Sequence, residues 1–475
     1  MKVAVPIPVP TKEMKEEHVP VHSRIWVSGA DGACATLGGL ATGGALTYYF
    51  TIWRGLDQNL AGLIWILFGI WNAINDPLFG YLSDRTRHKL GRRIPYIRFG
   101  APLYAAAFIA CWINWPGTQT DQTLMAVQLL IVLFLVDTLY TAIATSLYIM
   151  PYEMAVSNKA RSSIFVWKLA FMVFSTAIPL LLFNPIKPKP GEDPTSFILI
   201  MTAIGIAAGA VIFLSTFNYE EKHFQREKEQ IPFFQSIKEC FKNFSFIIFE
   251  VISFAVIFAQ TGLMQGIFYY FDEINVSPVQ LYAALAAGIG LGVILFIRQR
   301  ESWGVKRCVQ VFCLDFAIGC FLMLFFGRSP ILAPLGFLLI GIGFAGGMYL
   351  IPLMNGDVID KDEERTDLRR EGMYAGVNSF ITKPAISLAQ AFFLWSLKTS
   401  GYVQGAQPGT QTVQAQDGIL MGWMLAPAVL LTLSFVALHW YPLAGPAWNA
   451  VKQKLERVHA EKERRFLLEK GFRVD

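Results

Sequence analysis

Apolar segments of membrane-spanning length recur along the whole of this chain of 475 residues. A helix of about twenty apolar residues crosses about 30 Å of hydrocarbon. Hydrophobic residues make up 54% of the chain and charged residues only 16%, with a mean hydropathy of +0.44, which is unlike a soluble domain. The expected spans are residues 32–53, 60–83, 97–115, 123–150, 164–184, 196–216, 246–270, 279–297, 308–327, 331–354, 373–397 and 418–440. The sequence therefore predicts an all-α membrane protein with twelve transmembrane helices.

Lysine and arginine are distributed unevenly between the connections on the two sides of the membrane. The connections on one side hold Arg85, Arg87, Lys89, Arg92, Arg93, Lys159, Arg161, Lys222, Arg226, Lys228, Lys238, Lys242, Arg298, Arg300, Lys306, Arg307, Lys361, Arg365, Arg369 and Arg370. Those on the other side hold only Arg54, Lys187, Lys189, Arg328 and Lys398. Because cytoplasmic loops carry the excess of Lys and Arg, both termini are expected in the cytoplasm. The net charge of +5 reflects this topology and gives no reason to expect nucleic-acid binding.

Polar stretches divide the chain into two halves. We expect a cytoplasmic N-terminal tail (1–24) that lacks the apolar core of a signal peptide. A six-helix bundle (25–217), a cytoplasmic linker (218–245) and a second six-helix bundle (246–440) should follow. The C-terminal tail (441–475) should be cytoplasmic and partly helical, either as an amphipathic or as a solvated helix. Two six-helix halves resemble the major facilitator superfamily fold, in which the substrate site lies at the midplane between the halves.

An acid, Asp76, lies inside the second apolar segment. A carboxylate at membrane depth is costly and is by default a functional candidate. Asn72, Asn75 and Asp76 have the spacing i, i+3, i+4, so one face of a helix presents two amide oxygens and one carboxylate. Oxygen ligands suit a small hard cation or a proton. The alternative is structural: the acid caps a Pro-bent turn and the asparagines bond neighbouring helices.

Several motifs together carry a family resemblance. They are Asn75-Asp76-Pro77 with Gly80, Asp84-Arg85, Gly91-Arg92-Arg93 and Pro95-Tyr96 in the first half, and Lys242-Asn243, Gly356-Asp357, Asp360, Arg369 to Tyr374 and Ile381 to Pro384 in the second. This set resembles the glycoside-pentoside-hexuronide:cation symporters, the family of the melibiose permease. The resemblance implies cation-coupled symport of a sugar, glycoside or hexuronide-like solute by alternating access. It also implies a monomer in a lipid bilayer that needs no cofactor.

The resemblance also implies a coupling site. Asn72, Asn75, Asp76 and Tyr140 would form it, but Asn72 stands where the family has an acid and Tyr140 where it has a threonine. One remaining carboxylate is more easily neutralised by a proton than built into a dry sodium shell. We therefore expect proton coupling through Asp76, with sodium as second choice and uncoupled transport as third.

The expected substrate residues depart from the family as well. Thr36 and Ile143 occupy the positions of two sugar-binding acids, and Asp31 or Asp137 could replace them, unless these two acids only make interhelical hydrogen bonds. Lys383 matches an intramembrane lysine of the family.

Lys168 takes the place of a substrate-binding arginine in the family. Two lysines beside few acids make an anionic solute one option, whereas a Lys168 that snorkels to an interface would contact no substrate. Trp167 and Tyr140 are the better candidates for stacking on a sugar ring, although most aromatic residues are expected to be interface anchors.

Charged motifs at the cytoplasmic helix ends are expected to gate the transporter. Pairs that hold one access state and break in the other are a common switching device, although solvated topology charges are the alternative. The gating candidates are Asp84, Arg85, Arg92, Arg93, Asp357, Asp360, Arg369 and Glu371.

The sequence contains no signature of an enzyme. We find no His/Cys cluster, nucleophile motif or phosphate-binding loop, and the six cysteines suggest neither a disulfide nor a structural metal. Two alternatives to the symporter remain: a lysophospholipid or lipid transporter of the same fold, and a non-transporting membrane receptor or scaffold. The expected partners are a small-molecule solute, the coupling cation H⁺ or Na⁺, and the bilayer, which is the cell membrane if the host is prokaryotic.

Overall fold

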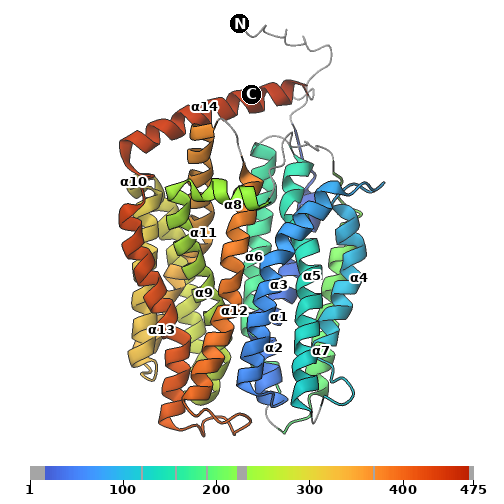
Figure 1. Ribbon diagram of the computed structural model, residues 1–475, viewed down its shortest axis with the longest axis vertical. Coiled ribbons are helices and arrows are strands. Elements are labelled where there is room, and N and C mark those ends of the chain that lie inside the picture. The colour runs from blue at the N-terminus through green and yellow to red at the C-terminus, as the bar shows by residue number, and fades with distance from the viewer. Residues whose placement is uncertain are drawn as a thin grey trace.

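The computed structural model describes residues 17–118, 121–155, 158–188, 191–221, 233–366 and 370–469, apart from some side chains within the helices. Over these residues the regular structure is entirely helical. Figure 1 shows two groups of roughly parallel helices standing side by side, with a further helix lying across one end. The two groups correspond to the two halves of the chain.

The N-terminal half contains one interrupted helix and five continuous ones. Its first span is built from α1 (Val21–Thr42), α2 (Ala45–Tyr48) and a π-helical turn (Tyr49–Trp53). The others are α3 (Gln58–Arg85), α4 (Ile94–Ala110), α5 (Gln122–Met154), α6 (Asn158–Ile186) and α7 (Thr195–Ser215). The starts of α3 and α5 follow from their sequence, because Asp57 and Asp121 accept hydrogen bonds from the first free amide groups of these helices.

The C-terminal half begins with a short helix, α8 (Phe233–Phe241), inside the expected linker. It continues with α9 (Phe244–Glu273), α10 (Pro278–Phe326), α11 (Leu332–Thr366), α12 (Glu371–Thr399) and α13 (Val413–Ala437). A 3₁₀ turn (Leu438–Trp440) leads to α14 (Gly445–Glu469).

Helix α10 contains two of the expected spans. Its backbone leaves helical geometry at Gly304, where φ is 75° and ψ is 162°. Gly288 before this break and Gly319 after it both lie against the same stretch of α11, next to Leu338 and Ile340. The two arms of α10 therefore fold back on each other, and the described helices account for all twelve expected spans.

Hydropathy alone finds fewer spans than the fold contains. Among the described residues, eight helices are long and apolar enough to cross a membrane, and α4 is apolar but shorter. Because α10 contains two spans, these eight helices and α4 supply ten of the twelve expected spans. The remaining two spans are those of α1 and α3. Helix α3 carries Asn72, Asn75 and Asp76, and these polar residues lower its hydropathy.

The two halves meet along α3 and α12, which run antiparallel. Gly62 lies near Ala391, Gly69 near Ser387, and Asp76 bonds Lys383, so residue numbers rise on one helix as they fall on the other. Small residues at such contacts let two membrane helices approach closely.

Helix α14 lies across one end of the bundle, which we call the α14 end (Figure 1). Its Lys452 ammonium lies 2.6 Å from Asp357 Oδ1, and His459 Nε2 lies 2.8 Å from Glu363 Oε2. Trp448, near the start of this helix, is buried. The C-terminal tail is therefore a helix docked on α11, which was not expected of a solvated tail.

Candidate functional site

Five polar residues from three helices meet in the interior, and we call them the central cluster: Asn75 and Asp76 of α3, Asp137 and Thr141 of α5, and Lys383 of α12. Lys383 Nζ lies 2.5 Å from Asp76 Oδ1 and 3.4 Å from Thr141 Oγ1. Asn75 Nδ2 donates to Asp137 Oδ2 at 2.8 Å and to Thr141 Oγ1 at 3.0 Å. The Lys383–Asp76 pair joins the two halves of the molecule.

The central cluster carries an unbalanced charge. Its two carboxylates and one ammonium sum to −1 when all three are ionised. Asp137 is 4% exposed, whereas the side chains of Asp76 and Lys383 are 22% and 16% exposed. Lys383 and Asp76 both lie within electrostatic range of Asp137. A single negative charge in a low-dielectric interior is costly, so the cluster is suited to bind one monovalent cation.

The other two residues expected at the coupling site lie differently. Asn72 is buried, and its Oδ1, like that of Asn75, has no hydrogen-bond partner among the described residues. Tyr140 lies against Gly38 and the ring of Tyr104, at 6.4 Å between ring centroids.

Thr141, which was not selected from the sequence, contacts both Asn75 and Lys383 of the central cluster. It lies one turn after Asp137 on α5, and this i, i+4 spacing is the signal that could have revealed it.

A second charge pair lies within the N-terminal half. Lys168 Nζ of α6 lies 3.2 Å from Asp31 Oδ2 of α1 and donates to the Leu147 carbonyl at 3.0 Å. The side chains of Asp31 and Lys168 are 33% and 11% exposed. Lys168 is therefore not a free cation, which removes one premise of the argument for an anionic solute.

The remaining substrate candidates are less directly placed. Thr36 is buried and donates to the Gly32 carbonyl of its own helix at 2.9 Å. Trp167 is half-buried beside Lys168 on α6. Tyr140 lies within electrostatic range of Asp31, Asp76 and Asp137. Tyr140 is therefore near enough to the central cluster and to the Asp31–Lys168 pair to feel the charges of both.

At the α14 end, the two arginines of the Gly91-Arg92-Arg93 motif bond within their own half. Arg92 Nη2 lies 2.9 Å from Glu153 Oε1, and Arg93 Nε lies 3.7 Å from the same oxygen. Glu221, just after α7, accepts the backbone N–H groups of Arg92, Arg93 and Ile94 at 2.7–2.8 Å. Neither Glu153 nor Glu221 was selected from the sequence.

Lack of space for a side chain explains the glycine in this motif. Gly91 has φ of 106°, and a Cβ built there would lie 2.5 Å from the Glu221 carboxyl carbon. Glycine thus lets the carboxylate reach the amino end of α4, where the helix dipole favours a negative charge.

The gating candidates of the second half are partly described. Asp357 bonds Lys452 of α14, and Asp360 is half-buried one turn later on α11. The pair that joins α11 to the start of α12 is Asp362–Arg370, at 2.7 Å, and Asp362 was not selected from the sequence. Arg369 and the side chains of Asp84, Arg85 and Glu371 lie outside the described residues.

At the end opposite α14, a set of contacts closes the two halves against each other, and we call it the closure seam. Lys187 and Tyr48 of the first half both bond Asp272 of α9, the lysine at 2.7 Å. The Thr51 and Tyr269 hydroxyls share a hydrogen bond of 2.8 Å. Further seam contacts are Asp57–Lys398 at 2.9 Å, Gln390 to the Thr42 carbonyl at 3.0 Å, and Gln404 to the Leu56 carbonyl at 2.7 Å.

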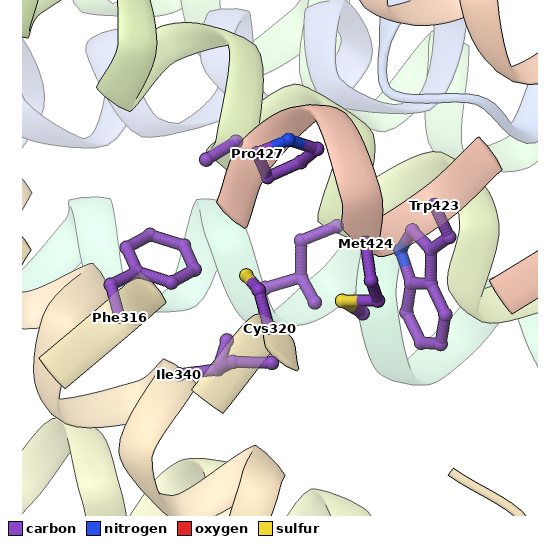
Figure 2. A pocket seen from close by; sticks show the side chains of 8 residues that line it. Phe316, Cys320, Ile340, Trp423, Met424 and Pro427 are labelled. Atoms are coloured by element: carbon purple, nitrogen blue, oxygen red, sulfur yellow. The ribbon is translucent and has the colours of Figure 1, made fainter. Parts of the chain in front are cut away.

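A small crevice in the C-terminal half offers a poor site for a sugar. It has an empty volume of about 160 Å³ and is lined by Ala259, Leu263, Phe316, Cys320, Ile340, Trp423, Met424 and Pro427. Figure 2 shows Phe316, Ile340, Trp423 and Pro427 around it. Its walls are almost wholly apolar, so it lacks the donors and acceptors that hydroxyl groups need.

Comparisons with known proteins agree with the fold and the motifs. The sequence model of the family described as MFS/sugar transport protein matches residues 29–445. The chain is 26% identical to the isoprimeverose transporter of Lactiplantibacillus pentosus, over 96% of each chain. It is 24% identical to the uncharacterized symporter YnaJ of Bacillus subtilis (strain 168), over 86% of this chain and 89% of that one.

The fold is also that of a solved transporter. The crystal structure of a D-xylose-proton symporter superimposes with a TM-score of 0.63 at 14% identity, covering 89% of this chain and 98% of that chain. The resemblance drawn from the sequence motifs is thus confirmed. This multi-pass membrane protein belongs to the MFS/sugar transport family and is a transporter, not an enzyme.

Proposed function

We propose that this chain is a secondary active transporter that carries a sugar or glycoside by cation-coupled symport. The observation that carries the proposal is the Lys383–Asp76 pair, which joins the two halves inside a cluster of net charge −1. A cation that neutralises this cluster changes the electrostatics at the contact between the halves. The similarity to the isoprimeverose transporter supports a sugar or glycoside as the solute.

The coupling ion that fits best is a proton shared between Asp76 and Asp137. Lys383 already donates to Asp76, and Asn75 already donates to Asp137 and Thr141. A proton on either carboxylate neutralises the cluster without displacing these donors. Because both carboxylates belong to one hydrogen-bonded cluster with Lys383 and Asn75, we assign the proton to the pair and not to one acid.

Sodium is the second candidate. Its support is the pair of unpartnered buried oxygens, Asn72 Oδ1 and Asn75 Oδ1. These oxygens and the carboxylates could ligate a hard cation, but the Lys383 ammonium would have to leave Asp76 first. A site that already holds an ammonium is therefore better suited to a proton.

The solute that fits best is an uncharged glycoside. The Asp31 carboxylate can accept hydrogen bonds from hydroxyl groups and the Lys168 ammonium can donate to them, so the pair presents both functions side by side. The Asp31–Lys168 pair is neutral overall, and the central cluster becomes neutral once it holds a cation. An anionic hexuronide, which would have to break one of the two lysine pairs, comes second.

The closure seam supports alternating access. It joins the halves at one end of the bundle, whereas the described contacts of Glu221 with Arg92 and Arg93 at the α14 end lie within one half. With the termini on the cytoplasmic side, as the Lys and Arg distribution favours, the seam faces outward. In a cell membrane, the described state is then closed toward the outside of the cell. Alternating access requires the cytoplasmic end to close when the closure seam opens.

Uptake into proteoliposomes tests this function. An inward proton gradient should drive accumulation of a neutral glycoside, with sodium making no difference, and a protonophore should abolish it. A panel of neutral disaccharides, hexuronides and lysophospholipids assigns the solute class. Uptake of lysophospholipids alone would replace the sugar by a lipid, accumulation driven only by sodium would exclude the proton, and no flux of any solute would favour a receptor or scaffold.

A further inference from the structure

A second buried acid, Glu250, lies in the C-terminal half on α9. It is the seventh residue of that helix, inside an expected span, and is 5% exposed. It forms no ion pair with any charged side chain that the structure describes. A carboxylate at membrane depth without a cationic partner is costly, and such residues are rare unless they have a task.

The neighbours of Glu250 are polar but neutral. One amide atom of Asn378 on α12 lies 3.2 Å from both Glu250 carboxyl oxygens and 3.2 Å from Ser253 Oγ. The nitrogen and oxygen of an amide are distinguished only by their hydrogen bonds. If the facing atom is Nδ2, it donates to an ionised carboxylate. If it is Oδ1, the contact needs a proton on Glu250, while the Ser253 hydroxyl donates to the same oxygen.

Asn378 can therefore form a hydrogen bond with either protonation state of Glu250, because a half-turn of its side-chain amide exchanges the donor for the acceptor. No other residue has to move, and neither state leaves Glu250 without a partner. A permanently ionised structural acid would need only the donor orientation, and in a structural role a glutamine would bond equally well without the cost of burying a charge.

Among the described residues, the charged groups on the helices around α9 have other partners or, like Lys238 of α8, are exposed to solvent. On α12, Lys383 is bound to Asp76, and on α11, Asp357 and Asp362 are bound to Lys452 and Arg370. On α13, Asp417 is bound to Arg328. Helix α8 brings the thiol of Cys240 within electrostatic range, and α2 reaches α9 only at the closure seam, where Tyr48 bonds Asp272. Since no cation among the described residues pairs with Glu250, protonation is the way left to neutralise it within this part of the structure.

We propose that Glu250 is a second proton-binding site, which gains a proton from water and returns it to water during the transport cycle. Asn378 lies on the same helix as Lys383, five residues before it, so the state of Glu250 is felt on the helix that carries the central cluster. This deepens the proposed proton coupling and rests on it for its role in transport, but the site itself can be tested without transport.

Infrared difference spectra of the purified full chain between acidic and alkaline buffer test the site. Protonated carboxyl groups give a C=O band that ionised ones lack. Glu250→Gln should remove one carboxyl component from the wild-type difference spectrum. Asp315→Asn, a matched change at a half-buried acid of α10 whose Oδ2 has no partner, should leave the Glu250 component in place. A spectrum unchanged by Glu250→Gln would overturn the proposal.

A second variant keeps the test valid if Glu250→Gln does not fold. Asn378→Leu removes the amide that stabilises the ionised carboxylate. The Glu250 component should then stay protonated across the whole pH range and vanish from the difference spectrum. A component that still titrates normally in this variant would contradict the role given to Asn378.

Transport assays distinguish the proposed proton coupling from the proposed proton-binding site at Glu250. If proton-driven uptake exists and Glu250→Gln lowers the number of protons moved per solute, both proposals hold. If Glu250 titrates but wild-type uptake ignores the proton gradient, the site stands and the proposed proton coupling falls. If uptake is proton-driven and the number of protons is unchanged in Glu250→Gln, the coupling stands and the role of Glu250 in it falls.

Discussion

At the scale of single residues, the proposed coupling depends on which charged side chains in the interior have a partner of opposite charge. Lys168 and Lys383 each have an acid within ion-pair distance. Among the described residues, the Asp137 carboxylate is bonded only by the Asn75 amide, and the Glu250 carboxylate contacts only the Asn378 amide. Both acids also contact α3 or α12, the helices along which the halves meet, so their charge can change there without breaking an ion pair, and we expect coupling to use them.

The clearest prediction at this scale concerns Asp76 and Asp137. Asparagine resembles a protonated carboxyl, so Asp76→Asn and Asp137→Asn should each lose gradient-driven uptake to the level of empty liposomes. Exchange of solute across the membrane should persist, since it needs no net release of the proton. Counterflow and gradient-driven uptake in the same liposomes measure the two activities.

The matched control is Asp315→Asn, a half-buried acid outside the central cluster. It should retain both activities. Undiminished gradient-driven uptake in both Asp76→Asn and Asp137→Asn would refute coupling through the central cluster.

At the scale of elements, contacts between segments distant in sequence position the helix ends. Glu221 follows α7 yet binds the start of α4, and Gly44 at the break between α1 and α2 lies against α9. Such contacts explain why the motif residues around them are small or charged. They also allow one helix end to be disturbed without touching the central cluster.

The first element-scale prediction concerns Glu221. Its carboxylate accepts three backbone N–H groups at the amino end of α4. Glu221→Ala should lower the stability of the protein by roughly 1–3 kcal/mol, the usual range for hydrogen bonds to a charged group. Thermal unfolding in detergent measures it. Glu220→Ala, the same change at the exposed neighbour, should have almost no effect, and equal losses in both variants would argue against the capping role.

The second element-scale prediction concerns Gly44, whose φ is 99°. A Cβ there would lie 2.5 Å from Gln265 Cα, which belongs to the other half, so separating the halves at the closure seam should relieve the clash. Gly44→Ala should therefore favour the state in which the seam is open. A single cysteine at Thr51, a buried seam residue, should then react faster with a water-soluble maleimide.

Gly55→Ala provides the matched control. Gly55 also has a positive φ, of 76°, but a Cβ there would meet nothing within 4 Å. Both variants bear the cost of a left-handed non-glycine residue, about 1–2 kcal/mol, but only Gly44→Ala adds the clash. Equal labelling rates in the two variants would show that the Gly44 contact does not control closure.

At the scale of the whole molecule, two bundles are joined firmly at one end. The contacts there combine a buried charge pair, aromatic rings and backbone carbonyls, from Thr42 on one half to Gln404 on the other. Its outermost pair, Asp57–Lys398, is partly exposed and should respond to pH. Acid should therefore act on the closure before it acts on either bundle.

The pH prediction follows from the Asp57 carboxyl. Burial raises its pKa, but hydrogen bonds from Lys398 and from the backbone amides of Leu60 and Asn59 outweigh this and leave the pKa below the ordinary 3.8. The ionised pair thus stabilises closure above pH 3.8 and is lost as the pH falls through the lowered pKa. Labelling of the Thr51→Cys protein with a dipyridyl disulfide, which still reacts with thiols in acid, should rise only in that acid range.

The size of this effect is modest, because an exposed pair contributes about 0.2–1 kcal/mol. Asp57→Asn should abolish the acid-dependent rise and show a slightly faster labelling rate at neutral pH. An identical acid response in Asp57→Asn would assign it to another group.

The sequence predicts the fold better than the site. Lengths of apolar sequence give all twelve spans, including the two within α10, because crossing hydrocarbon is a local requirement. The i, i+4 spacing of Asp137 and Thr141 could have completed the central cluster. By contrast, Asp31–Lys168, Glu221 with Arg93, and Tyr48 with Asp272 join residues more than one hundred positions apart, and only the folded chain brings such pairs together.

The docking of α14 has a mechanical consequence. Its described polar contacts, Lys452–Asp357 and His459–Glu363, are made to α11, so the helix extends the C-terminal half. Its 25 residues, at about 1.5 Å rise each, form an arm roughly 37 Å long. Such an arm works as a lever, because a small rotation of the C-terminal bundle produces a larger displacement at its tip. That displacement could be detected by a binding partner or measured by experiment.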